Sequence, residues 1–287
     1  LRKAVAQCAS GMKALGVTAN DRVAAVLPNC PEAVIGMLAA ASLGAIWSSC
    51  SPDFGINGIY DRLGQISPKI LITVNAYNYN GKEHQCLDKI REISQRISSI
   101  ESVLVAAFTE TPMELQGKEQ PWEALLDTSA GPLAFAQLPF DHPLYILYSS
   151  GTTGLPKSIV HGAGGTLLKH LTEHRYHADV QFGDRLFYFT TCGWMMWNWL
   201  ASGLASGATL ILYDGAPGFP DMGRMWRLID DQRITHFGTS PKFLGAVNKA
   251  GYSPKAKNQL NSLRVILSTG SPLPSDLFSW VYSEVAS

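Results

Sequence analysis

Short apolar runs and longer amphipathic stretches alternate along the chain. The apolar runs of the first half are short enough for buried strands, and they are bounded by polar residues, Gly or Pro. Helical periodicity covers residues 1–15, 31–43 and 87–97. Strands that alternate with helices are typical of a parallel sheet covered by helices. The pattern predicts strands at residues 23–27, 45–48, 69–74, 103–108 and 144–148.

The same alternation continues in the second half. It predicts strands at residues 186–189, 209–213, 235–239 and 265–269, and helices at residues 165–177, 197–206, 222–231 and 241–249. Residues 109–143 break the pattern and are either an excursion or a seam between two subdomains. We therefore expect an α/β fold of mostly parallel sheets flanked by helices, with a first α/β subdomain over residues 1–143 and a second over 144–287.

Composition narrows the possible partners. The chain has 287 residues and a formal net charge of zero, which argues against nucleic acid or an anionic membrane surface as the main partner. No apolar run approaches the roughly 20 residues that a membrane-spanning helix requires. The five cysteines are widely spaced, without a C-x-x-C pair, which indicates buried free thiols in a reducing compartment. We expect a cytosolic location.

Residues 148–158 read Tyr-Ser-Ser-Gly-Thr-Thr-Gly-Leu-Pro-Lys-Ser and follow a predicted strand. Glycines allow the backbone to approach a polyanion closely, and successive N–H groups can converge on phosphate oxygens. The hydroxyls are neutral donors, and Lys157 supplies a mobile point charge. A Gly/Ser/Thr surface turn is the ordinary alternative, but such a turn does not need a Pro-Lys pair after its second glycine. The segment indicates a loop that binds a triphosphate.

This loop differs from the Walker P-loop, G-x-x-x-x-G-K-[ST]. Counting from Gly151, the position that requires the second glycine is Pro156. Proline has no N–H to donate and a fixed φ, so it would remove one contact to the phosphate. A P-loop phosphotransferase is therefore disfavoured, and no G-x-S-x-G motif suggests a serine hydrolase.

The string at residues 150–157 resembles the signature S-G-T-T-G-x-P-K-G of the adenylate-forming enzymes, which include acyl-CoA synthetases, luciferases and peptide-synthetase adenylation domains. Ser158 stands where the signature usually has glycine, which we interpret as a subfamily trait. The resemblance implies part of a large N-terminal domain whose loop holds the β- and γ-phosphates of ATP while a carboxylate attacks the α-phosphate. It implies catalytic roles for Lys157, Thr152 and Thr153, and a second segment that lies against adenine. The implied ATP-binding residues are Ser149, Ser150, Gly151, Thr152, Thr153, Gly154, Lys157, Gly270, Ser271 and Pro272.

The loop at residues 191–199 contains three tryptophans. Trp194 follows a glycine at a strand end, where a flat ring can bound a small pocket. The resemblance sharpens this interpretation, because a glycine–tryptophan pair walls off the acyl pocket at the matching place in acetyl-CoA synthetases. Met195 and Met196 are candidates for the pocket rim, although core packing is nearly as well supported. Thr269 could donate a hydrogen bond to the acyl substrate.

Several residues have ordinary structural interpretations. Trp197 and Trp199 fit the core, and Ser271 also fits the cap of a following helix. His170 and His174 are spaced i, i+4 without a third metal ligand, so we assign them to a solvated helix face. No metal site is expected within this chain.

Five segments together narrow the resemblance to the acetoacetyl-CoA synthetase branch of the family: residues 51–55, 79–84, 161–166, 191–199 and 212–215. The branch implies an AMP-forming acid–thiol ligase that joins acetoacetate to CoA with ATP and Mg²⁺. In acetyl-CoA synthetases an F-G segment and a basic residue contact CoA, and Phe54, Gly55 and Lys82 match them. An acetyl- or other short-chain acyl-CoA synthetase is the alternative.

The resemblance also implies that part of the machinery lies outside this chain. The acid that holds magnesium in the family, the ribose-binding aspartate and the C-terminal domain with its adenylation lysine have no counterpart up to Ser287. We therefore expect both subdomains to be truncated at their outer ends and this chain alone to be inactive. A non-catalytic nucleotide-binding fragment is the second alternative. The expected partners are the small molecules acetoacetate, ATP and CoA.

Overall fold

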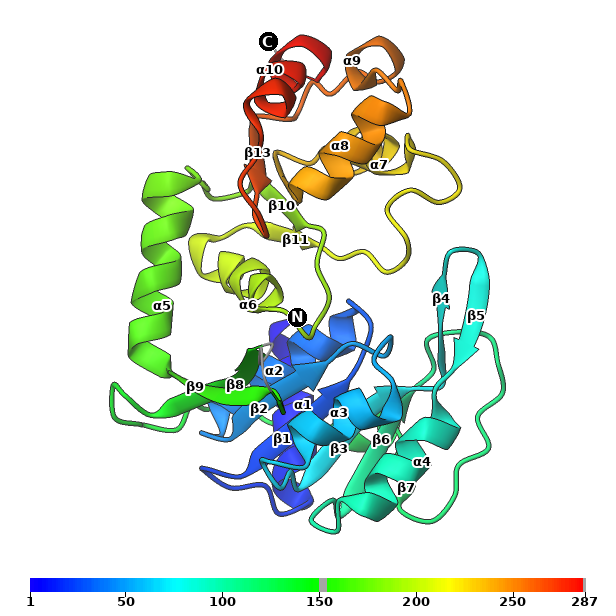
Figure 1. The fold of residues 1–287 in the computed structure, drawn as a ribbon. Coiled ribbons are helices and arrows are strands. Elements are labelled where there is room, and N and C mark those ends of the chain that lie inside the picture. Colours follow the sequence, from blue (N-terminus) through cyan, green and yellow to red (C-terminus); the bar gives the residue numbers. More distant parts are fainter. Residues whose placement is uncertain (150–153, 286–287) are drawn as a thin grey trace. The chain divides into compact units, whose positions relative to one another are not determined.

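The computed structural model describes residues 1–149 and 154–285, which form two compact units (Figure 1). The first unit comprises Leu1–Asn78, Glu83–Leu167 and Thr191–Met195, and the second comprises Tyr79–Lys82, Leu168–Thr190 and Met196–Ser287. The subdomain boundary expected after residue 143 stays a prediction. Strands β8 and β9, which follow that residue, belong to the sheet of the first unit.

The first unit contains a seven-stranded sheet in the order β7-β6-β3-β1-β2-β8-β9. Neighbouring strands are parallel except β8 and β9, which pair antiparallel. The strands are β1 (Arg22–Val26), β2 (Ile46–Cys50), β3 (Ile70–Val74), β6 (Ser102–Ala106), β7 (Glu119–Pro121), β8 (Pro143–Ser149) and β9 (Lys157–Gly162).

Helices cover both faces of this sheet, and adjacent strand residues serve opposite layers because side chains alternate across a strand. Leu71 lies in a buried cluster with Ile59 of α3 and Ile90 of α4. The next residue, Ile72, lies against Gly36 of α2, its Cδ1 atom 3.2 Å from where a Cβ would stand. The helices are α1 (Arg2–Ala14), α2 (Pro31–Ser42), α3 (Ile56–Leu63) and α4 (Leu87–Arg96).

The second unit contains a four-stranded parallel sheet in the order β11-β10-β12-β13. Phe187 and Phe237 stack with their centroids 5.3 Å apart and pack against Trp226 of α7. On the other face, Leu186 and Tyr188 pack in one cluster with Trp199 of α6. The strands are β10 (Arg185–Tyr188), β11 (Thr209–Ile211), β12 (His236–Thr239) and β13 (Val265–Ser268). The helices are α6 (Met195–Ser202), α7 (Arg224–Gln232), α8 (Pro241–Lys249), α9 (Pro254–Lys257) and α10 (Ser275–Glu284), and α5 (Ala163–Thr172) is shared with the first unit.

The predicted α/β class with parallel sheets is confirmed. The elements that had not been predicted include α3, β7, β9, α9 and the hairpin formed by β4 (Ala76–Tyr79) and β5 (Lys82–Gln85). Short turns of 3₁₀ helix lie at Trp122–Leu125 and Gly203–Ser206, and a π-helical turn at Glu173–His177 extends α5. All five cysteines are buried thiols outside any disulfide bond, as expected. Within the described ranges, no helix is both long enough and apolar enough to cross a bilayer.

Candidate active site

The predicted phosphate loop connects two antiparallel strands of the first unit. Ser149, the last residue of β8, pairs with Lys157, the first residue of β9. This pair closes the loop at its base, and the Lys157 side chain is exposed there. Gly154 is described and has open space where a Cβ would stand. The predicted residues Ser150, Gly151, Thr152 and Thr153 lie outside the described residues.

A side-chain amide holds the downstream limb of this loop. Gln65, which follows α3, donates from Nε2 to the carbonyl oxygen of Pro156 at 2.8 Å. Its Oε1 atom accepts a hydrogen bond from the hydroxyl of Ser158 at 3.1 Å. Gln65 therefore bridges the residues on either side of Lys157. It gives Ser158, the residue that departs from the family signature, a specific partner. The sequence offered no signal for Gln65, because neither α3 nor β9 had been predicted.

The strand that leads into the loop is supported by a half-buried tyrosine. The Tyr148 hydroxyl lies 3.0 Å from Ser48 Oγ, which donates to the carbonyl oxygen of Ile146 at 2.9 Å. Burial raises the pKa of Tyr148 well above its usual range, so the phenol stays neutral. The guanidinium of Arg62 lies 4.7 Å from the centroid of the Phe54 ring and 6.0 Å from that of Tyr148, distances typical of cation–π contacts.

The aromatic loop begins in the first unit, where buried hydrogen bonds anchor it. Ser49 Oγ donates to the carbonyl oxygen of Cys192 at 2.7 Å, and the Cys192 thiol contacts the carbonyl oxygen of Pro28 at 3.2 Å. A Cβ on Gly193 would lie 3.3 Å from the Phe54 ring, so this segment runs close to the predicted CoA-contacting residue. The next residue, Trp194, is 61% exposed, which is inconsistent with simple core packing.

The other residues of the aromatic loop divide between surface and core. Met195 is 48% exposed, whereas Met196 packs against a buried cluster of the second unit. Trp197 and Trp199 are buried, which confirms their expected core role. The predicted acyl-pocket residue Thr269 is exposed and lies one residue beyond β13 in the second unit.

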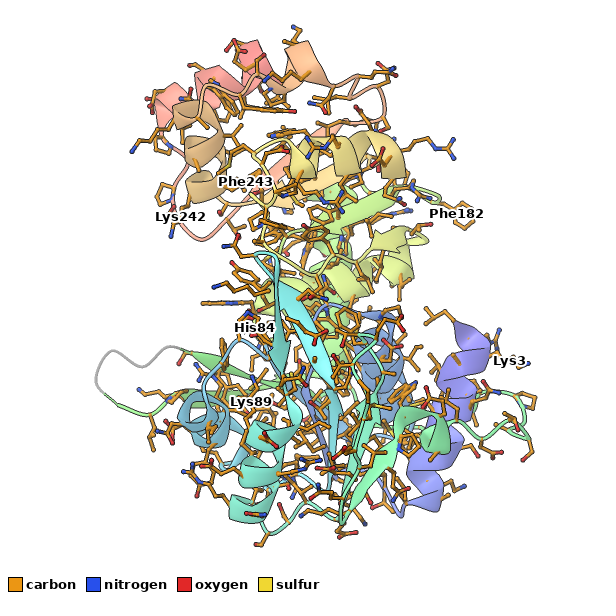
Figure 2. The ribbon with its side chains drawn as sticks, turned by 90° about the vertical axis from the view of Figure 1, so that its right-hand side faces the viewer. Lys3, His84, Lys89, Phe182, Lys242 and Phe243 are labelled. Carbon is orange, nitrogen blue, oxygen red and sulfur yellow. The ribbon has the colours of Figure 1, made fainter. Side chains whose placement is uncertain are left out.

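The predicted CoA-contacting residues lie on separate elements. Phe54 packs against the core of the first unit, Gly55 precedes α3 with open space above its Cα atom, and Lys82 is exposed at the start of β5. Two side-chain contacts in the first unit had not been predicted from the sequence. His84 stacks on Tyr77 with their centroids 5.1 Å apart, and Lys89 of α4 donates to the carbonyl oxygen of Pro52 (Figure 2).

The predicted adenine segment also lies in the second unit. Gly270 has φ +97°, a conformation that glycine adopts without strain. Ser271 and Pro272 are exposed. The expectation that Ser271 caps a helix is wrong, because α10 begins only at Ser275 and Pro274 precedes it. The segment is thus a free loop after β13 rather than the start of a helix.

The assignment of two histidines to a solvated helix face is wrong. His170 and His174 are 7% and 0% exposed. Both rings reach Ser202 Oγ of α6, at 2.9 Å from His170 Nδ1 and 3.0 Å from His174 Nε2. Burial lowers the pKa of His174 to about 4, so this ring is neutral at physiological pH. Among the described residues, no group of three or more His, Cys, Asp or Glu side chains could hold a metal ion.

Comparisons with known proteins agree with this architecture. Residues 1–287 match the model of the AMP-binding enzyme family. The chain is 50% identical to an acetoacetyl-coenzyme A synthetase of Rhizobium meliloti, over 99% of its own length and 44% of the relative's. It is 44% identical to a malonamoyl-CoA synthetase of Penicillium aethiopicum, over 100% of the chain and 43% of the relative.

A solved structure matches as well. The acetoacetyl-CoA synthetase from Streptomyces lividans superposes with a TM-score of 0.94 at 44% identity, over 99% of this chain and 43% of that one. The expected resemblance to acetoacetyl-CoA synthetases is therefore confirmed, and the chain spans less than half the length of the relatives it matches. Since the family model covers every residue, the chain belongs to the AMP-binding enzymes.

Proposed function

We propose that this chain works in an enzyme that joins acetoacetate to CoA in two half-reactions. In the first, the carboxylate attacks the α-phosphorus of ATP, an acyl-adenylate forms and pyrophosphate leaves. In the second, the CoA thiol attacks the acyl carbonyl carbon, the thioester forms and AMP leaves. The observation that carries the proposal is the 50% identity to an acetoacetyl-coenzyme A synthetase along almost the whole chain.

The phosphate loop has a defined role in this proposal. Lys157 and the hydroxyls of Thr152 and Thr153 would offset negative charge on the departing pyrophosphate. The pairing of Lys157 with Ser149 supports this role, because it holds the ammonium-bearing residue at the exit of the loop. Adenine would lie on the backbone at residues 270–272, a proposal supported by the exposure of these three residues.

The proposal also assigns residues to the acyl site and to the approach of the CoA thiol. Trp194, Met195 and Met196 would bound the acyl chain, and Thr269 would donate a hydrogen bond to it. The exposure of Trp194 supports a role outside the core. The CoA thiol would approach along Phe54, Gly55 and Lys82, a route supported by the short distance between Phe54 and the residue that precedes Trp194.

Malonamate is a second candidate substrate, because one relative is named as a malonamoyl-CoA synthetase at 44% identity. Acetoacetate and malonamate share a carbonyl group at C3, which butyrate and acetate lack. We therefore propose that the acids used by this enzyme carry a C3 carbonyl. A general short-chain acyl-CoA synthetase would show no such preference.

The remaining ligands follow from the same proposal. ATP, CoA and the acid are the small-molecule partners, and Mg²⁺ would neutralise phosphate charge. The described residues provide no cluster of donors for Mg²⁺, so we assign none of them to it. The five buried thiols outside any disulfide bond support a reducing location such as the cytosol.

The test uses the full-length polypeptide that contains this chain. It should exchange radiolabelled pyrophosphate into ATP only when acetoacetate is present, and it should form acetoacetyl-CoA and AMP when CoA is added. Omission of the acid is the blank, and butyrate at equal concentration is the specificity control. Equal exchange with acetate, butyrate and acetoacetate would reduce the proposal to a general short-chain ligase.

A further inference from the structure

A tyrosine at the carboxyl end of β10, an inner strand of the second sheet, reaches across the neighbouring strand to the one beyond it. Tyr188 ends β10, and its register partner on β12 is Gly238. A Cβ on Gly238 would lie 2.1 Å from Cδ2 of Tyr188. The ring therefore occupies the space that any other residue at position 238 would fill. Because β12 separates β10 from β13, the missing side chain lets the phenol pass over β12 toward β13.

Strand register explains what the phenol meets there. Gly238 pairs with Leu267 on β13, and Leu267 packs in the same cluster as Tyr188. Thr269 lies two residues after Leu267, so alternation places it on the same face. The Tyr188 hydroxyl lies 3.0 Å from Thr269 Oγ1 and 3.2 Å from the carbonyl oxygen of Thr239.

The proton of the phenol has two possible acceptors. If Tyr188 donates to the Thr239 carbonyl, Thr269 uses its own proton on the phenol oxygen and has none left for a ligand. If Tyr188 donates to Thr269 Oγ1, the threonine proton is free to point elsewhere. The Thr239 carbonyl already accepts the Thr269 N–H at 3.3 Å, so it does not depend on Tyr188. Burial raises the pKa of Tyr188, which keeps its proton in place at neutral pH.

We infer that Tyr188 is a specificity-determining positioning residue: it donates to Thr269 Oγ1, so that the Thr269 hydroxyl donates to the C3 carbonyl oxygen of the acid. This inference rests on the proposed function and extends it to a residue that does not touch the substrate. An acid without the C3 oxygen leaves the Thr269 proton unpaired. The preference for acids with a C3 carbonyl group then depends on the Thr269 hydroxyl, which the Tyr188 hydroxyl holds in orientation.

The phenol oxygen can be separated from the ring by substitution. Tyr188→Phe keeps the ring above Gly238 and its edge-on contact with Trp199, whose centroid is 6.0 Å away. It removes only the hydroxyl, and with it the contacts to Thr269 Oγ1 and to the Thr239 carbonyl oxygen. Thr269→Val removes the hydroxyl that would meet the substrate, and Thr269→Ser retains one. Tyr282→Phe is the matched control, because Tyr282 is 60% exposed on α10 and its ring, which the substitution keeps, makes a tilted contact with that of Phe278.

The experiment measures kcat/KM of the full-length enzyme for acetoacetate, malonamate and butyrate. In Tyr188→Phe, the ratios of acetoacetate and malonamate to butyrate should each fall about 3- to 10-fold, the range for one net hydrogen bond. Butyrate kcat/KM should change little. Thr269→Ser should keep most of the preference, and Tyr282→Phe all of it. In Tyr188→Phe/Thr269→Val, the preference should fall no further than in Thr269→Val alone, because the two hydroxyls act in series.

The outcomes separate this inference from the proposed function. Wild-type enzyme without preference for acetoacetate over butyrate would overturn the proposed substrate class. A preference that survives in Tyr188→Phe, or one that falls additively in the double variant, would overturn the role of Tyr188 alone. A uniform loss for all three acids would mean that the hydroxyl is structural, and would also overturn the inference.

Discussion

Hydrogen bonds hold both the exit of the predicted phosphate loop and the carboxyl end of β10 in the second sheet. The first place is exposed to solvent and the second is buried. At the loop exit, exposed Gln65 bridges Pro156 and exposed Ser158. At the carboxyl end of β10, Tyr188 is 3% exposed, and its hydroxyl joins β10 to Thr239 and Thr269. Water can replace a lost hydrogen-bond partner at the loop exit, whereas it is excluded from the buried Tyr188.

This difference predicts how each place responds to substitution. Loss of a solvent-accessible hydrogen bond costs little, because water takes over the freed groups. At a buried site, a larger side chain causes strain and the loss of a partner leaves a polar group unpaired. Both cost more stability than the loss of an exposed hydrogen bond. We therefore expect tolerance at the loop exit and intolerance in the second unit, with Lys157, which we propose offsets charge on the pyrophosphate, as the exception.

Lys157 gives the largest expected effect. Lys157→Ala in the full-length enzyme should slow formation of the acyl-adenylate by about 10²–10³-fold, because one preorganised charge is lost where the pyrophosphate charge develops. The thioester step from preformed adenylate should be nearly unchanged. Lys169→Ala is the matched control, since Lys169 is exposed and pairs with Glu173 at 2.8 Å. Equal losses in both half-reactions would show that Lys157 is structural.

The buried histidine of the second unit gives the next effect. The folded pKa of His174 is about 4 against an ordinary 6.5, so the unfolded chain binds this proton more readily. The free energy of unfolding should therefore fall as the pH drops from 6.5 toward 4, by roughly 3 kcal/mol at most. Urea unfolding at several pH values measures it.

The His174→Gln variant removes the titrating ring and should flatten this pH profile. His236, also buried with a lowered pKa, leaves a residual slope of the same sign. His170 and Glu173 are the other charged or titratable groups that act on His174. An unchanged profile in the variant would assign the pH dependence to other groups.

Gly238 tests the space that Tyr188 occupies. A Cβ at this position overlaps the tyrosine ring, so Gly238→Ala should lower the free energy of unfolding by about 1–3 kcal/mol. Gly165→Ala is the control, because Gly165 lies in α5 with open space around its Cα atom. That substitution should raise stability by up to about 1 kcal/mol through helix propensity. Thermal unfolding of both variants checks the contrast, and equal stabilities would refute it.

The loop exit should show the smallest effect. Gln65→Ala or Ser158→Ala should lower the rate of adenylation about two- to fivefold, as expected for an exposed hydrogen bond. The double variant should be no worse than Gln65→Ala, because both residues belong to one bridge. A loss as large as that of Lys157→Ala would mean that the exposed bridge matters as much as the charge, and the comparison above would fail.

The sequence predicted the buried strands better than the short helix α3 and the exposed strand β9. Apolar runs correctly located the strands of both sheets except β7 and β9, because strands buried on two faces give continuous apolar stretches. Helix α3 was missed because its eight residues include Gly58 and only two buried side chains. Strand β9 was missed because it lies at the sheet edge, where its first four residues are exposed and carry no alternating pattern.

The candidate site shows the same limit. The phosphate loop could be proposed from the sequence because glycines, hydroxyls and a lysine lie consecutively in it. Gln65 and Tyr188 could not, because their partners lie 91 and 81 residues away and depend on folding. The histidine pair was wrongly placed in solvent because i, i+4 spacing does not reveal which face is buried. The partner that makes burial possible, Ser202, comes from another helix.

The antiparallel pairing of β8 with β9 has a consequence for the order of folding. Parallel neighbours in this sheet need a crossover before they can meet, whereas Ser149 and Lys157 are joined by a single short loop. Hairpins of this kind form in about 1–10 μs, and closure of a short loop costs little chain entropy. The pairing of β8 with β9 therefore joins the strands of the first sheet that are closest in sequence. These two strands can find each other before the crossovers that complete the sheet.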